Sequence, residues 1–155
     1  QGDVAGAGRF YNALLEGKEY GSGQRVAAVR GNALQERIEN LLAEDIPLPK
    51  MQLIEAAALL RQFGQIDPGS RGNGRFSLLR ARILQKRGWL SGALGELEGA
   101  ILFEPLLPNL PEVEFARAEV YAQAGNAAKA EELYRKVSSE YPNHPVAEKA
   151  RRKLP

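Results

Sequence analysis

The feature that most constrains the fold is a spaced pattern that occurs twice. Gly88 and Gly125 are each followed, at identical offsets, by a small residue, a bulky apolar residue, another apolar residue and a proline. A glycine permits a tight turn, a small residue lets two helices approach closely, and a proline ends the helix that precedes it. The spacing therefore predicts a helical hairpin at each glycine. The two sets are Ala93, Leu97, Ala100 and Pro105 after Gly88, and Ala130, Tyr134, Val137 and Pro142 after Gly125.

Helix-forming residues dominate the chain, and β-branched residues never alternate over a convincing strand, so the sequence predicts an all-α fold. Apolar residues at three- and four-residue steps predict one buried side per helix. The glycine-rich segment 64–75 predicts a linker. The expected helices are 24–44, 50–63, 76–87, 91–103, 112–124 and 127–140. The expected inward residues are Val26, Val29, Leu34, Ile38, Leu41 and Leu42 in the first helix, and Met51, Ile54, Ala58 and Leu60 in the second.

The repeated residues resemble the tetratricopeptide repeat, whose period is about 34 residues. The two copies here lie 37 residues apart, which we assign to a three-residue extension in "LLPNLP". The resemblance implies tandem antiparallel helix hairpins, an α-solenoid stacked as a right-handed superhelix. It places repeats at about 74–107 and 111–144 within a region 69–155, followed by the start of a capping helix in which Pro145 suits the first turn.

The region 1–68 is expected to be a divergent helical part, either degenerate repeats or a cap, because Ala56, Leu60 and Pro68 have the spacing of a second-helix signature. The two C-terminal copies depart from the family pattern where its first helix has large apolar residues. Leu78, Leu79 and Phe115 are expected to compensate there. The departing residues are Ser77, Arg80, Glu114 and Arg117.

In the family that the chain resembles, the first helix of each hairpin lines a concave groove that binds peptides. Carried over position by position, this implies the partner-binding residues Arg75, Leu78, Arg82, Gln85, Lys86, Phe115, Glu119 and Gln123. Independently of the family, Arg75, Arg82 and Lys86 share one helical side through their spacing.

Charge along the chain adds a hypothesis about this groove. Six basic residues and no acid lie between Asp67 and Glu96, whereas six acids and only Arg117 lie from Glu96 to Glu119. We expect a groove that is basic at one end and acidic at the other, and that orients a peptide whose apolar residue meets Phe115. The alternative is that these charges only solvate helix faces.

Catalysis, cofactors and metals are not expected. The chain has no cysteine, which excludes thiolate sites, and no Ser-His-Asp, metal-ligand or nucleotide constellation appears around its one histidine or elsewhere in the sequence. Adjacent carboxylates such as Glu131 and Glu132 diverge on a helix. Tyr121 and Tyr134 are expected in the core, Trp89 between adjacent hairpins, and His144 on the surface.

The sequence therefore predicts a non-enzymatic scaffold or adaptor whose partner is another protein or peptide. A net charge of +2 does not favour nucleic acid, although a basic-patch nucleic-acid-binding helical protein is the alternative from another class. Self-association stays open. The ending "SSEYPNHPVAEKARRKL" resembles bacterial envelope proteins that carry this repeat, which implies a periplasmic or envelope-associated place. A cytosolic co-chaperone-like adaptor is the other placement, and no transmembrane segment is expected.

Overall fold

The computed structural model describes residues 22–43, 49–66, 74–103 and 107–155. Regular structure in these residues is α-helical, without a strand, which confirms the all-α prediction. Of the features predicted from sequence, residues 1–21, Pro68 and most of the linker, and Pro105 lie outside the described residues. The helices are α2 (Ser22–Leu42), α3 (Lys50–Ile66), α5 (Arg75–Lys86), α6 (Leu90–Phe103), α7 (Leu110–Gln123), α8 (Ala127–Glu140) and α9 (Pro145–Arg151).

Both repeated glycines make the turns that the spacing predicts. Gly88 and Gly125 each have a φ of 79°, a left-handed conformation that favours glycine. The amide of Trp89 donates to the Leu84 carbonyl at 2.9 Å, and the amide of Asn126 donates in the same way to Tyr121 at 2.9 Å. These are Schellman motifs, which satisfy the last carbonyls of α5 and α7 and turn the chain into the next helix.

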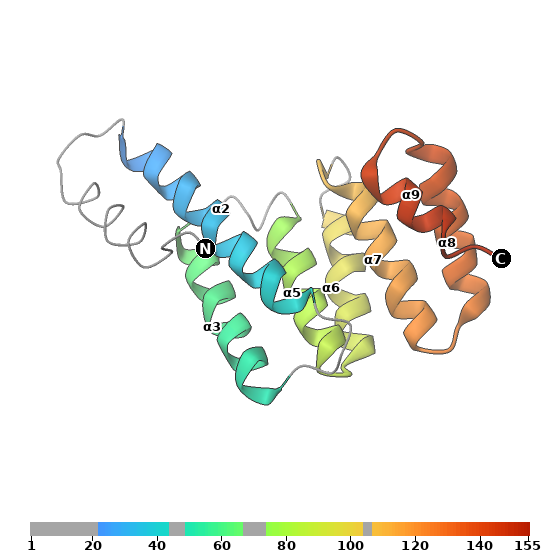
Figure 1. The fold of residues 1–155 in the computed structure, drawn as a ribbon, viewed down its shortest axis with the longest axis horizontal. Helices are drawn as coiled ribbons and strands as arrows, with labels where there is room; N and C mark the ends of the chain where they lie inside the picture. Colours follow the sequence, from blue (N-terminus) through green and yellow to red (C-terminus); the bar gives the residue numbers. More distant parts are fainter. Residues whose placement is uncertain (1–21, 44–48, 67–73, 104–106) are drawn as a thin grey trace.

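The helices pack as consecutive pairs that follow one another along the long axis of the molecule (Figure 1). α2 packs on α3, α5 on α6, and α7 on α8, while α9 packs on both α7 and α8. The pairs are joined because α3 contacts α5 and α6 contacts α7. In addition, α2 contacts α5, and α5 contacts α7, so these helices adjoin one another along one side.

The core of the described residues consists of three apolar clusters, each of which joins one helix pair to the next helix. Phe63 lies in the cluster of α2, α3 and α5, Leu97 in that of α5, α6 and α7, and Val137 in that of α7, α8 and α9. The small residues of the repeated pattern lie at the close approaches within the pairs and are buried: Ala81, Ala93, Ala118 and Ala130. The predicted core role of Tyr134 is confirmed, and Tyr121 packs partly buried against the same cluster.

The predicted inward side of α3 is wrong in part. Met51 is 74% exposed, Ile54 is 55% exposed and Ala58 is exposed, whereas Leu60 is buried as expected. The stretch "LIEAAALL" is apolar around much of the helix, so its periodicity permits more than one inward stripe. Contact with Ile38 of α2 selects the buried set, which is Leu53, Ala56, Leu59, Leu60 and Phe63.

Two further positions differ from expectation. Trp89 is 67% exposed and does not pack between hairpins, because it lies in the turn, where its amide completes the Schellman motif before α6 begins. Val29 of α2 is 41% exposed, although Ile38 and Leu42 of the same predicted stripe are buried.

The cluster around Phe63 also contains Leu79 and Ile83 of α5, so apolar contacts cross the predicted boundary at residues 68 and 69.

Candidate partner-binding groove

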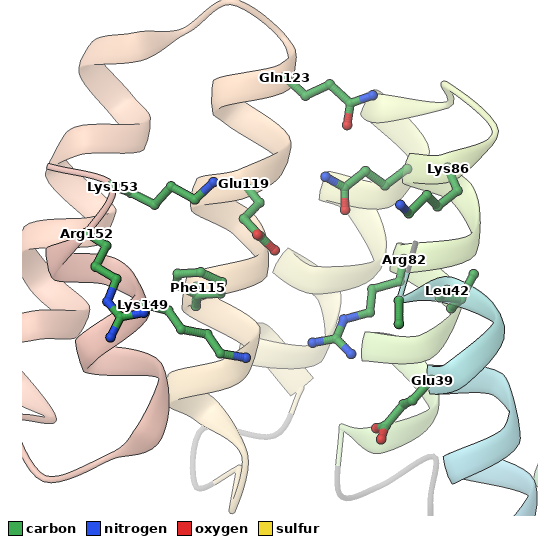
Figure 2. Close-up of a pocket in the computed structure, with 12 residues that line it drawn as sticks. Glu39, Leu42, Arg82, Lys86, Phe115, Glu119, Gln123, Lys149, Arg152 and Lys153 are labelled. Carbon is green, nitrogen blue, oxygen red and sulfur yellow. The ribbon is translucent and has the colours of Figure 1, made fainter. Parts of the chain in front are cut away.

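A groove of about 750 Å³ lies between helices that are not neighbours in sequence. Figure 2 shows side chains from α2, α5, α7, α9 and the residues after α9 converging on it. We call this the groove throughout. Its lining residues are Glu39, Leu42, Ala43, Arg82, Gln85, Lys86, Phe115, Glu119, Gln123, Lys149, Arg152 and Lys153.

Most of the residues implied by the family resemblance lie together in this groove. Arg82, Gln85 and Lys86 come from α5, and Phe115, Glu119 and Gln123 come from α7. Because α5 and α7 are in contact, residues from the first helix of each predicted repeat form one continuous wall.

Arg75 and Leu78 do not line the groove. The Arg75 guanidinium donates to Asn32 Oδ1 at 2.9 Å and, through Nε, to Gln35 Oε1 at 2.6 Å, and it lies 5.6 Å from the centre of the Phe63 ring. Leu78 is buried in the cluster between α5, α6 and α7. Arg75 therefore joins α5 to α2, and Leu78 belongs to the core.

Phe115 forms part of the floor of the groove and presents little surface to it. The side chain is only 6% exposed, and its ring packs on Tyr134 with the ring centres 5.6 Å apart. Burial, together with the negative charge of Glu119, raises the pKa of Tyr134 to about 12, so its phenol stays neutral at ordinary pH. An apolar partner residue would gain little contact with Phe115.

The sequence prediction omitted the two ends of the groove. Glu39 and Leu42 come from α2, Ala43 follows it, and Lys149, Arg152 and Lys153 come from the C-terminal end of the chain. The run "EKARRK" signalled a basic segment, but no spacing rule relates it to α5. No signal in the sequence indicated the α2 residues.

The charge of the groove differs from the expected basic-to-acidic gradient. Cations stand on both sides of α7, Arg82 and Lys86 on one side and the C-terminal residues on the other, and Glu119 lies between them (Figure 2). Among the lining residues that the structure describes, five are basic and two, Glu39 and Glu119, are acidic. This described part of the lining therefore has a net positive charge.

His144 positions the helix that carries Lys149. Its Nδ1 accepts the Val146 amide at 3.3 Å as the N-cap of α9, and its Nε2 lies 3.4 Å from Glu112 Oε1 of α7. Its side chain is 30% exposed, so His144 lies at the surface as expected, but it also makes these two contacts. Pro145 occupies the first turn of α9, as predicted.

Within the described ranges, no group of three or more His, Asp or Glu residues is placed to hold a metal ion. None of the helices that the structure describes is long and apolar enough to cross a membrane. Comparison of the chain with protein-family models, with curated proteins and with solved structures found no match. The functional argument therefore rests on the groove itself.

Proposed function

We propose that this protein is a non-enzymatic interaction scaffold that binds a segment of a partner protein in the groove. The observation that carries the proposal is the convergence of side chains from four helices, α2, α5, α7 and α9, on one concave surface. Such a surface is preformed by the fold, and a preformed groove binds a flexible segment without paying for its own ordering.

The architecture that we propose for this scaffold is a tandem hairpin stack similar to tetratricopeptide repeats. Support comes from the two glycine turns and from the order of contacts, in which each pair adjoins the next and α2, α5 and α7 adjoin one another. In a stack of this kind each unit contacts mainly its neighbours, and the curved side becomes an extended binding face.

A role in bacterial envelope assembly, as the C-terminal resemblance implies, is part of this proposal, with a cytosolic adaptor as the other placement. Separation of periplasmic and cytoplasmic fractions of the source organism, followed by immunodetection of the protein, distinguishes the two. Recovery in the cytoplasmic fraction alone would reject the envelope role and leave the groove unaffected.

The test of the proposed function is selection of binders from a displayed library of random peptides. We expect the intact chain to enrich peptides, and we expect the double charge reversal Arg82→Glu with Lys86→Glu to lose them. The matched control is Lys50→Glu with Arg61→Glu, which makes the same charge change at exposed positions of α3 outside the groove.

Circular dichroism and thermal unfolding must show that both double variants are folded. If no peptide is enriched, or if both double variants retain the same peptides, the groove is not the binding surface and the proposal is wrong.

A further inference from the structure

Three cations from distant parts of the described chain line the groove and form no ion pair there. Arg82 comes from α5, Lys149 from α9 and Lys153 from the residues after α9. Figure 2 shows the Arg82 and Lys149 side chains extending toward each other below Phe115. Within the described part of the chain, none of these three side chains forms a hydrogen bond or an ion pair.

Cations elsewhere in the described structure are commonly paired. Arg80 of α5 lies 3.2 Å from Glu96, and Lys129 of α8 lies 2.7 Å from Glu132. Like charges that face one another repel, and this repulsion is relieved when an anion binds between them. Unpaired cations that meet across a concave surface therefore indicate a site for an anionic group from outside the chain. Further pairs outside the groove are Arg37–Glu55, Arg117–Glu114 and Arg135–Glu131, whereas Arg152, which lines the groove, pairs with Glu148.

The floor of the groove adds little apolar attraction. Phe115 and Leu42 line it, but they are only 6% and 7% exposed. A partner that depended on a deep apolar anchor would find no pocket for it, whereas carboxylates would find an arginine fork on one wall and two lysines on the other.

We propose that the groove takes an acidic segment of a partner protein, with carboxylates held between Arg82 on α5 and Lys149 and Lys153 at the C-terminal end. This inference rests on the proposed function and specifies the chemistry of its partner. It also gives α9 and the residues after it a direct role in binding, beyond their packing on α7 and α8.

A nucleic acid fits the same groove less well. Single-strand binders stack bases on exposed aromatic rings, and among the described lining residues the one aromatic, Phe115, is buried. Glu39 and Glu119 would also repel a backbone that carries a charge at every nucleotide. A peptide can place carboxylates opposite the cations and neutral residues opposite Glu119.

The experiment measures fluorescence anisotropy of three labelled probes of equal length. The probes are a peptide of alternating Glu and Ser, its analogue with Gln in place of Glu, and a single-stranded oligothymidylate. We expect the full chain to bind the Glu peptide at least about tenfold more tightly than the Gln analogue, since several charge-assisted contacts distinguish them. We also expect the affinity to fall as salt is raised.

Two variants of equal charge locate the site. Arg82→Gln with Lys149→Gln should weaken binding of the Glu peptide by about tenfold or more, because two charge-assisted contacts are lost. Lys50→Gln with Arg61→Gln should change it by less than about twofold, since these residues lie outside the groove. The single change Lys149→Gln, at an exposed position, should give part of the loss and keeps the test valid if the double variant unfolds.

Absence of binding to the Glu peptide, equal affinity for its Gln analogue, tighter binding of oligothymidylate, or equal losses in both double variants would each overturn the inference. The library selection separates this failure from that of the proposed function. Enriched peptides without acidic residues that still require Arg82 and Lys86 would leave the scaffold proposal standing and reject the acidic partner.

Discussion

At the scale of single residues, Glu114 is a buried carboxylate whose charge is compensated by two cations. Its side chain is only 3% exposed, and its carboxylate accepts from Arg117 Nη1 at 2.6 Å and from Lys136 Nζ at 2.9 Å. The hydrogen bond to Glu114 is the main cause that raises the pKa of Lys136. Arg117 also lies 3.6 Å from Glu98. This polar network joins α6, α7 and α8.

Replacement of this carboxylate should destabilise the fold. We expect Glu114→Gln to lower the free energy of unfolding by about 2–3 kcal/mol. The change leaves Arg117 and Lys136 without their buried carboxylate, and solvent only partly screens the charges of these two cations. Urea unfolding followed by circular dichroism measures the change. Glu131→Gln, which breaks an exposed pair with Arg135, should cost less than about 0.5 kcal/mol. Equal costs for the two variants would show that burial of Glu114 has no energetic role.

The raised pKa of Tyr134 predicts that the folded protein loses stability at alkaline pH. Its pKa is raised to about 12 in the folded chain from 10.0, so the folded state holds the phenolic proton through a pH range in which the unfolded state has lost it. The stabilising contribution is complete below pH 10 and disappears as the pH rises through about 12, at roughly 3 kcal/mol in total.

Unfolding free energies measured at several pH values across this interval should therefore fall less steeply for Tyr134→Phe than for the unchanged chain. Tyr121→Phe is the control, at a partly buried tyrosine whose hydroxyl donates to the exposed Glu98. An unaltered slope in Tyr134→Phe would contradict the assigned cause.

At the scale of elements, the turn glycines and the helix glycines should respond to the same substitution with opposite signs. A Cβ added at Gly88, Gly125 or Gly95 would meet no atom within 4 Å, so backbone conformation alone decides the outcome. Gly88→Ala and Gly125→Ala should each cost about 1–2 kcal/mol because the left-handed conformation disfavours alanine. Gly95→Ala, inside α6, should instead stabilise by about 0.5–1 kcal/mol. Thermal unfolding of the three variants checks the signs, and stabilisation by Gly88→Ala would contradict the Schellman assignment.

The helices themselves were predictable because their start and stop signals are local. α8 spans Ala127–Glu140 as the sequence predicts, with the glycine turn before it and Asn126 as its N-cap, accepting the Lys129 amide at 3.1 Å. The burial of α3 was not predictable in the same way. Its apolar residues surround much of the helix. The packing of α2 and α5 against α3 buries Leu53 and Phe63, and it leaves Met51 and Ile54 exposed.

At the scale of the whole molecule, the three separate apolar clusters predict that a core substitution destabilises mainly the helices of its own cluster. Phe63→Ala removes the largest fully buried side chain of the first cluster and should cost about 3–4 kcal/mol, and Val137→Ala in the third cluster should cost about 2 kcal/mol. Because each cluster joins only adjoining helices, the loss of protection should concentrate in α2, α3 and α5 for the first variant and in α7, α8 and α9 for the second.

Native-state hydrogen exchange resolved by peptide mass spectrometry measures this pattern. A uniform loss of protection across all helices in either variant would show that the chain unfolds as one cooperative unit.

The wall of the groove was predictable in part from the sequence. Helical spacing places Arg82 and Lys86 on one side of a helix, the resemblance implies these two and Glu119 as groove residues, and all three line the groove. The sequence prediction assigned Arg75 to the groove, but its guanidinium donates to side chains of α2. That helix lies some forty residues earlier, and no local pattern relates it to Arg75. The cations at the C-terminal end were missed because the packing of α9 on α7 and α8 brings them to the groove.

The sequence by itself determined the helical class, the two glycine turns and most helix ends to within one residue, since each depends on backbone preferences that act over a few residues. The tertiary structure decided which apolar stripe of α3 is buried, how Glu114 is compensated, and which charges meet across the groove. These depend on the contact of helices that lie far apart in the chain, where the position of one helix relative to another, and not its own sequence, sets what each side chain touches.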